Sequence, residues 1–174
     1  MVRAVFPGTF DPIHYGHIDI ANRASKLFDE LIIAVYDRPL KNLLLLPEER
    51  IALVKKCFHQ NKKINTIGYW GLTVDLCKQI DAQVIVRGLR VFSDFEYEFR
   101  MALANKRLSQ EIEVVALITG EEHSFLSSST VKEIAALDGD ISSMVPKHVM
   151  TLLHDKYKQI RKNDNNFDPT SLRD

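Results

Sequence analysis

The sequence contains few cysteines and no excess of charge of either sign. Cys57 and Cys77 are too few for a disulfide framework, and they lack the C-x-x-C spacing of redox and metal motifs. We therefore interpret both as reduced core thiols of a cytoplasmic protein. Lysine and arginine total 23, and aspartate and glutamate also total 23. This balance argues against a protein that binds nucleic acid through its phosphates, although it allows a local cationic pocket for a small anion.

Long apolar runs are also lacking. No stretch approaches the roughly 18 apolar residues that span a membrane, and a strand-like pattern at residues 2–6 follows Met1 directly, so we expect no membrane segment and no signal peptide. Hydrophobic residues still make up 45% of the 174 residues, which is enough for a real core. We predict one domain over residues 1–162, followed by a polar, mobile tail over residues 163–174.

Apolar runs of strand length alternate with helical patterns along the chain. Strands are expected at residues 2–6, 31–36, 64–70, 83–86 and 114–118, and helices at 17–28, from 47, 72–80, 93–108, from 130 and 146–162. This order predicts an α/β fold: a Rossmann-like, doubly wound, parallel five-stranded sheet with helices on both faces and a C-terminal helix.

Two of the helices carry more specific signals. Thr130 and Glu133 have the spacing of a capping box, which predicts that a helix begins at Thr130. In the helix at 93–108, one side is expected to be apolar, formed by Phe95, Phe99, Ala102 and Leu103.

Ligands of such sheets bind beyond the carboxyl ends of the strands, which directs attention to the loop at residues 7–17. This loop is neither a G-x-G-x-x-G fingerprint nor a Walker A motif. It carries the hydroxyl of Thr9 and, at the entry to a helix, His14 and His17, so it can form a compact phosphoryl site. The alternatives are an ordinary pair of surface or capping histidines and, less favoured because no third ligand is near, a metal site.

Other candidates lie at later strand ends. Arg87 and Arg90 flank a glycine after the fourth strand and offer forked donors to phosphate. The serines at 127–129 could cap a helix, present its N–H groups to phosphates, or do both. Taken alone, Lys41 would be a solvated loop lysine and Glu98 part of a solvated acidic helix face.

These residues carry a family resemblance. Gly8-Thr9-Phe10-Asp11-Pro12 and His14-Tyr15-Gly16-His17 resemble the H-x-G-H signature of the nucleotidyltransferase superfamily. Further blocks at 87–90, 94–98 and 124–129, together with Lys41, narrow the resemblance to the bacterial phosphopantetheine adenylyltransferases over residues 2–153. The resemblance implies transfer of the adenylyl group of ATP to 4′-phosphopantetheine, which gives dephospho-coenzyme A and pyrophosphate. The implied mechanism is direct attack at the α-phosphate without a covalent enzyme intermediate.

The resemblance also implies roles for individual residues. His17 would stabilise the α-phosphate, and Thr9 and Lys41 would align the incoming phosphate, so these three are the catalytic candidates. Phosphopantetheine would contact Thr9, Lys41, Thr73 and Arg87. ATP would contact Thr9, Phe10, His17, Gly88, Leu89, Arg90, Glu98, His123, Ser124, Phe125, Leu126, Ser127, Ser128 and Ser129. No dense carboxylate cluster suggests a metal site built by the protein, so Mg²⁺ would be carried mainly by ATP phosphates and water. The family implies a homohexamer.

Two residues depart from the family pattern. His123 stands where tryptophan or tyrosine is common, which would weaken stacking on adenine, and Thr73 stands where a larger apolar residue is common near the pantetheine arm. Two other functions stay open. One is a related transferase that acts on nicotinamide mononucleotide or a choline-type phosphate. The other is a catalytically silent nucleotide-binding module, which would not need both His17 and Lys41.

Overall fold

A single parallel sheet organises the chain in the computed structural model, which describes residues 1–38, 43–90 and 92–163. In this part of the chain the strands are β1 (Arg3–Gly8), β2 (Glu30–Tyr36), β3 (Ile64–Tyr69), β4 (Val84–Leu89) and β5 (Glu113–Ile118). Their order is β3-β2-β1-β4-β5, and all neighbours are parallel. Because β4 returns to the other edge of β1, the winding reverses between these two strands. The predicted doubly wound sheet is confirmed.

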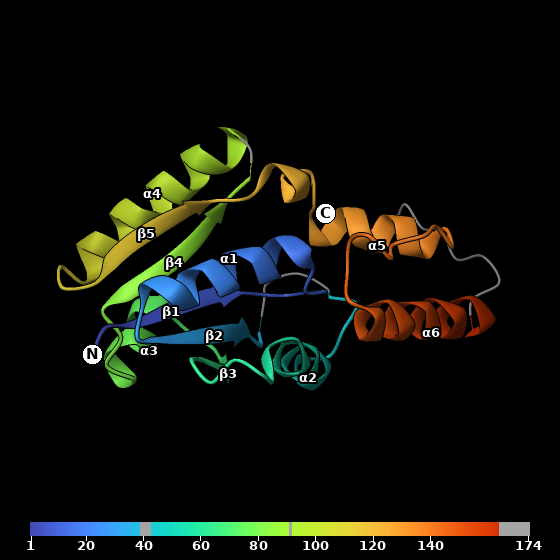
Figure 1. Cartoon of the computed structure of the whole chain (residues 1–174), viewed down its shortest axis with the longest axis horizontal. Helices are drawn as coiled ribbons and strands as arrows, with labels where there is room; N and C mark the ends of the chain where they lie inside the picture. The colour runs from blue at the N-terminus through green and yellow to red at the C-terminus, as the bar shows by residue number, and fades with distance from the viewer. Residues whose placement is uncertain (39–42, 91, 164–174) are drawn as a thin grey trace.

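Helices cover both faces of the sheet. The helices are α1 (Tyr15–Leu27), α2 (Pro47–Phe58), α3 (Thr73–Gln79), α4 (Phe92–Leu108), α5 (Ser128–Ala136) and α6 (Lys147–Asn163), with a short 3₁₀ turn at Glu121–His123. Successive strand residues point to opposite faces, so Ala4 and Phe6 pack with α1 and α2 while Val5 packs with α3. The strands point toward α5 and α6, which lie side by side beyond the carboxyl ends of the strands (Figure 1).

Three predicted boundaries shift in ways that matter for function. The first helix begins at Tyr15 with His14 as its N-cap, so His17 lies inside the first turn. Strand β4 continues to Leu89, so Arg87 and Gly88 belong to the strand and do not follow it. The predicted helix start at Thr130 is wrong, because the Ser127 hydroxyl accepts a hydrogen bond from the Thr130 amide at 2.9 Å and caps a helix that begins at Ser128.

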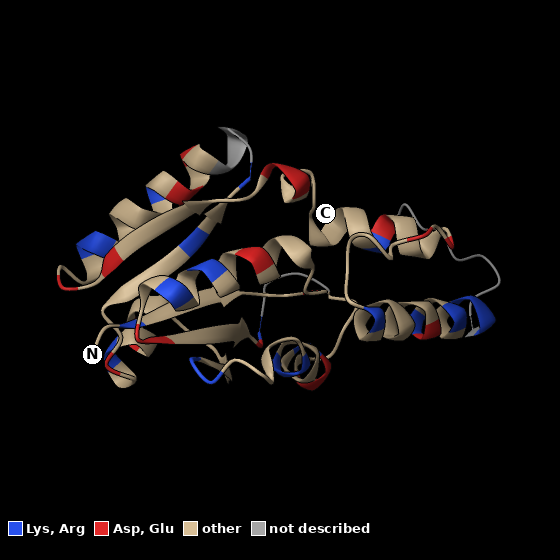
Figure 2. Ribbon diagram, viewed as in Figure 1, with Lys and Arg blue, Asp and Glu red and all other residues tan. Residues whose placement is uncertain are grey.

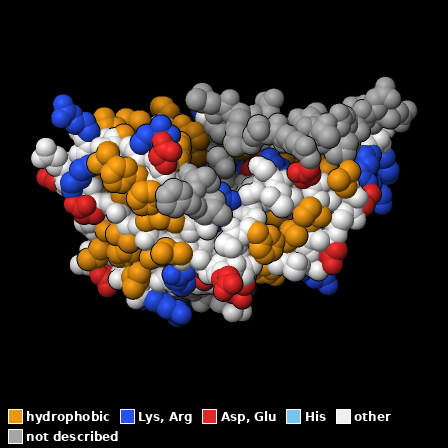
Figure 3. Space-filling model, turned by 90° about the horizontal axis from the view of Figure 1, so that it is seen from above, with side chains coloured by type: hydrophobic (Ala, Val, Ile, Leu, Met, Phe, Trp, Pro, Cys, Tyr) orange, Lys and Arg blue, Asp and Glu red, His pale blue; other side chains and the backbone are white. Residues whose placement is uncertain are grey.

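The apolar side of α4 is exposed in the single chain. Phe95, Phe99 and Leu103, which lie on the side predicted to be apolar, are 51%, 52% and 56% exposed. Hydrophobic side chains gather over the end of the molecule that α4 and β5 occupy (Figure 3). Periodicity identified an apolar side here, but it did not indicate whether this chain covers it.

Both cysteines are free, as expected. Cys77 is fully buried and Cys57 half-buried, and burial raises the pKa of these thiols to about 11 and about 12. No helix in the described part of the chain combines the length and apolar character needed to cross a membrane. Charged residues of both signs are interspersed along the helices (Figure 2). Helix α6 ends at Asn163, so the first residue of the tail predicted at 163–174 belongs to the helix, and residues 164–174 lie outside the described residues.

Candidate active site

A cavity of about 620 Å³ opens where the winding of the sheet reverses. Its walls come from the loop after β1, the first turn of α1, the carboxyl ends of β2, β3 and β4, the side of α4 and the start of α5. Open α/β sheets bind their ligands at this reversal point, and the volume suits a nucleotide-sized ligand. The rule that ligands bind beyond the carboxyl ends of the strands, which directed attention to the loop at 7–17, therefore also leads to this cavity.

Two stacked histidines form one side of the cavity. His14 is 2% exposed, and its ring centroid lies 3.7 Å from that of His17. The backbone N–H of His14 donates to Nδ1 of His17 at 3.3 Å. Since Nδ1 accepts, the neutral imidazole carries its proton on Nε2, which makes Nε2 the hydrogen-bond donor of the ring. The buried ring of Phe10 meets His17 edge-on at 5.0 Å and supports its orientation.

The environment keeps both histidines neutral. Burial lowers the pKa of His14 to about 3, assisted by the charges of Arg90 and His123. Burial also lowers the pKa of His17 well below its ordinary value, and His14 (when it is protonated), Arg90 and Arg87 act in the same direction through their positive charge. At neutral pH His17 therefore serves as an uncharged donor, and the positive charge of the cavity comes from the arginines.

Arg87 is held by a carboxylate. Its Nε and Nη2 donate to Oε2 and Oε1 of Glu98 on α4, both at 2.6 Å, and its Nη1 donates to the Pro7 carbonyl at 3.3 Å. Burial opposes the charge of the guanidinium, but the hydrogen bonds and charge of Glu98 raise the pKa of Arg87 above its ordinary value. Glu98 was expected to contact ATP, yet its immediate partner is the arginine expected on the phosphopantetheine side. This bidentate pair fixes where the guanidinium lies.

The start of α5 faces the histidines. Ser127 caps the helix, and the backbone N–H groups of the first turn have no acceptor within the helix, which makes this end attractive to anions. Arg90 donates to the carbonyl of Leu126, directly before the cap, at 2.8 Å. The cavity thus places imidazole, guanidinium and helix N-terminus around one space, an arrangement suited to several phosphate groups.

Most of the expected site residues meet at this cavity. Those that line it are Thr9, Phe10, His17, Thr73, Arg87, Gly88, Arg90, Glu98, Ser127, Ser128 and Ser129. Leu89, His123, Ser124, Phe125 and Leu126 lie on the flanking segments and are not among the lining residues. Lys41 lies outside the described residues.

The segment after β5 contains most of the expected residues that do not line the cavity. Phe125 is 60% exposed, whereas Leu126 is fully buried. The His123 ring stacks on Tyr15, with ring centroids 6.2 Å apart. The weaker stacking on adenine that was expected for His123 stays a prediction.

Several cavity residues were missed by sequence reasoning. Tyr36 and Tyr69 end adjacent strands, and their rings meet edge-on at 5.1 Å. The Tyr69 hydroxyl bonds the Thr73 hydroxyl at 3.0 Å, so Thr73 brings a polar pair to the wall where the family commonly has an apolar residue. The rule that ligands bind beyond strand ends would have found both tyrosines if it had been applied to the strands predicted at 31–36 and 64–70.

Arg50 had no recognisable signal in the sequence. It is 1% exposed and donates to the carbonyls of Tyr36 at 2.6 Å, Thr9 at 2.8 Å and Leu45 at 3.2 Å. Burial lowers its pKa, while the charge of Asp11 acts to raise it. One buried guanidinium therefore ties together three backbone segments beneath the cavity.

Within residues 1–38, 43–90 and 92–163, no three His, Cys, Asp or Glu side chains lie close enough together to hold a metal ion.

Comparisons with known proteins agree with this geometry. The sequence profile of the cytidylyltransferase-like family matches residues 5–134. The chain is 46% identical over 157 residues to a phosphopantetheine adenylyltransferase of Roseiflexus sp. (strain RS-1), covering 90% of this chain and 98% of that one. It is 46% identical over 160 residues to one from Pelagibacter ubique, covering 89% and 98%.

A solved structure shares the fold. The lipopolysaccharide core biosynthesis protein from Thermoplasma volcanium GSS1 superposes with a TM-score of 0.53 at 22% identity, over 70% of this chain and 99% of that chain. The family profile matches residues 5–134, and the named relatives match about nine-tenths of the chain. The chain therefore belongs to the cytidylyltransferase-like family and, within it, to the phosphopantetheine adenylyltransferases.

Proposed function

We propose that this protein transfers the adenylyl group of ATP to 4′-phosphopantetheine and releases pyrophosphate, with dephospho-coenzyme A as the product. The observation that carries the proposal is the meeting of His17, Arg87, Arg90 and the start of α5 at one cavity. That cavity lies in a chain which is 46% identical to named phosphopantetheine adenylyltransferases over most of its length.

The reaction is a direct displacement at phosphorus. A phosphate oxygen of the acceptor forms a bond to the α-phosphorus of ATP while the bond from that phosphorus to the bridging oxygen of pyrophosphate breaks. No side chain forms a covalent intermediate, so catalysis consists of alignment and of stabilising charge on the transferring group. The Nε2–H of His17 donates to an α-phosphate oxygen, and the neighbouring His14 amide keeps the proton on that nitrogen.

The two substrates occupy different parts of the cavity in this proposal. The β- and γ-phosphates lie against Arg90 and the first turn of α5, where exposed N–H groups favour anions. The acceptor lies toward Arg87, Thr73 and the tyrosine pair, with Thr9 between the two substrates and Lys41 aligning the incoming phosphate. Glu98 acts here through Arg87, because both of its carboxylate oxygens already accept hydrogen bonds from Nε and Nη2 of that guanidinium.

Mg²⁺ belongs to the proposal as a partner of ATP. The Glu98 carboxylate is paired with Arg87, and the other polar groups of the cavity are imidazole, guanidinium, hydroxyl and amide, whereas Mg²⁺ prefers carboxylates, phosphates and water. We therefore assign most of its ligands to the ATP phosphates and water, where the ion neutralises part of their charge.

The assembly and location are also proposed. The homohexamer is the assembly that the family resemblance implies, the exposed apolar side chains of α4 support association between chains, and light scattering tests the number of chains by molar mass. Consumption of ATP supports the cytoplasmic location expected from the reduced cysteines.

The deciding experiment measures pyrophosphate release from ATP with and without 4′-phosphopantetheine, with the product identified by mass. Release that depends on 4′-phosphopantetheine and yields dephospho-coenzyme A is the expected result. Activity with nicotinamide mononucleotide or a choline-type phosphate instead would identify a different transferase of the superfamily. ATP binding without turnover on any acceptor would identify a silent binding module.

A further inference from the structure

A buried ion pair outside the cavity joins two segments that line it. Lys132 on α5 donates from Nζ to Oδ2 of Asp11, in the loop after β1, at 3.0 Å. The Lys132 side chain is 7% exposed and the Asp11 side chain 2%. Neither residue lines the cavity, yet each belongs to a segment that does. The pair therefore connects the histidine side of the cavity to the helix that faces it.

A second contact lies on the same side of α5. Ser128 precedes Lys132 by four residues, so both side chains leave the helix on one face, one turn apart. The Ser128 hydroxyl donates to the Pro12 carbonyl at 2.9 Å, beside the residue that Lys132 contacts. Helix α5 is thus attached to Asp11 and Pro12 at two successive turns.

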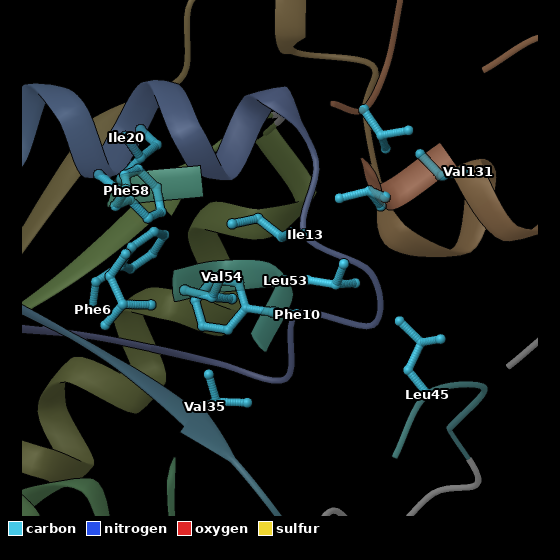
Figure 4. Packing of buried hydrophobic residues seen from close by; sticks show 14 of the residues in the cluster. Phe6, Phe10, Ile13, Ile20, Val35, Leu45, Leu53, Val54, Phe58 and Val131 are labelled. Atoms are coloured by element: carbon cyan, nitrogen blue, oxygen red, sulfur yellow. The ribbon is translucent and has the colours of Figure 1, made fainter. Parts of the chain in front are cut away.

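Apolar packing completes this junction. Ile13, next to Pro12, and Val131, next to Lys132, are both fully buried in the same core (Figure 4). Apolar contacts resist separation but tolerate small sliding, whereas a charged hydrogen bond at 3.0 Å has a defined length and direction.

Asp11 also organises the backbone beside it. Its Oδ1 accepts from the Leu45 amide at 2.8 Å and its Oδ2 accepts from the Leu44 amide at 3.1 Å. The carboxylate thus has three donors from two separate segments of the chain. A buried ion pair of this kind often adds little to stability compared with apolar residues of similar size, so its main effect is on geometry.

We propose that Asp11 and Lys132 are positioning residues that set the spacing between His17 and the N-terminus of α5, and so the placement of the ATP triphosphate. The proposal rests on the proposed function in naming ATP as the ligand. Neither residue touches substrate. Both act through the first turn of α5 and the loop that precedes His17. Because a displacement of about 1 Å at a reacting centre can reduce the rate about 100-fold, a small shift of α5 has a large effect.

The test is the double variant Asp11→Asn with Lys132→Met, which removes both charges at similar side-chain volume. Each single variant would leave one buried charge without its partner and lower stability for that reason alone. The double variant is expected to fold with a somewhat lower melting temperature than the wild-type protein, because Asp11→Asn keeps only one acceptor oxygen for the Leu44 and Leu45 amides. Its Kd for MgATP, measured by calorimetry, is expected to rise about 10-fold. The kcat for pyrophosphate release falls by at least about 10-fold, and the KM for 4′-phosphopantetheine changes less than the Kd for ATP.

A matched control exists elsewhere in the chain. Lys156 on α6 pairs with Glu49 on α2 at 2.8 Å, and neither lines the cavity. The double variant Glu49→Gln with Lys156→Met removes an ion pair between two helices, and its ATP affinity and kcat are expected to match those of the wild-type protein.

Two results would overturn the proposal. One is a folded Asp11→Asn, Lys132→Met protein with wild-type ATP affinity and kcat. If that protein does not fold, the variant Lys132→Arg decides, because it keeps the charge but replaces a compact ammonium with a longer, forked group. A Lys132→Arg protein with unchanged ATP affinity would be the second contradicting result. A wild-type protein that binds ATP but forms no dephospho-coenzyme A would refute the proposed function alone, since the affinity comparison does not depend on the acceptor.

Discussion

The two walls of the cavity differ in how far this chain buries the residues that form them. In the wall made by the loop after β1, α1 and α5, Asp11 and His14 are each only 2% exposed. Arg50 of α2, which donates to the Thr9 carbonyl of this wall, is 1% exposed. In the wall made by β4 and α4, one bidentate ion pair faces the cavity, and the far side of α4 leaves apolar rings open to solvent. The first wall has its geometry determined within one chain, whereas the second leaves apolar surface that this chain does not cover.

This contrast separates the expected effects of mutation. Changes in the first wall should alter how the triphosphate is aligned. Changes in the second wall should alter how the acceptor binds and how chains assemble. The predictions below test that separation, beginning with the largest expected effect.

Replacing His17 with Ala is expected to lower kcat by about 10²-fold or more, since it removes one donor to charge that develops in the transition state. The half-buried ring also accepts the His14 amide, so the free energy of unfolding should fall by about 1 kcal/mol. Steady-state kinetics and urea unfolding measure the two effects. His17→Gln is a matched variant that restores a neutral N–H donor and should recover part of kcat. An unchanged kcat in His17→Ala would remove this residue from the mechanism.

Acid should destabilise the first wall. The pKa of His14 is about 3 in the folded protein and about 6.5 when unfolded, so between these values the unfolded chain binds more protons. Stability is therefore expected to fall as pH falls through 6.5, by about 2 kcal/mol at pH 5 from this residue. Urea unfolding at pH 7 and pH 5 measures the loss, and His14→Gln should reduce it. An equal loss in the two proteins would show that His14 is not its source.

In the second wall, replacing Arg87 with Ala should raise the KM for 4′-phosphopantetheine by about 10-fold and the KM for ATP by less, because one charged hydrogen-bonding partner of the acceptor is lost. Glu98→Gln should also raise the KM for 4′-phosphopantetheine, but by less, because the guanidinium of Arg87 is then held less firmly. Glu96→Gln on the same helix is the control, since the Glu96 side chain is 79% exposed. Equal effects of Arg87→Ala on the two KM values would contradict the placement of Arg87 on the acceptor side.

The smallest effect on protomer stability is expected at the outer face of α4. Replacing Leu103 with Asp should change the free energy of unfolding of the protomer by only about 0.5 kcal/mol, because the side chain is exposed. It should nevertheless reduce the molar mass of the assembly measured by light scattering. Leu27→Asp on α1 is the control, an isolated apolar side chain that is 63% exposed. A Leu103→Asp protein with the wild-type molar mass would exclude this face from the interface.

The fold followed from the sequence because its evidence is local. The apolar run at residues 31–36 and the helix opening at Pro47 each identify an element without reference to distant residues. The rule that ligands bind beyond strand ends then directed attention to the loop of His17 and to the arginines after Val86. The end of β4 was placed too early because Arg87 and Gly88 interrupt its apolar run while the backbone continues in the sheet.

The rest depends on contacts between distant residues. Arg50 bonds carbonyls of three separate segments, and Asp11 bonds a lysine 121 positions away, so no local pattern marks either residue. The neutral state of His17 follows from burial and neighbouring charges. The helix start at Ser128 was missed because Ser127 and Thr130 are both acceptable caps, and the contact between them selects Ser127.

The central claim is that His17 and the start of α5 hold one triphosphate between them. A crystal structure with a non-hydrolysable ATP analogue and Mg²⁺ tests it most directly. The expected complex has an α-phosphate oxygen about 3 Å from Nε2 of His17, with the β- and γ-phosphates at the first turn of α5 and beside Arg90. A complex in which the triphosphate contacts neither the imidazole of His17 nor the start of α5 would contradict it.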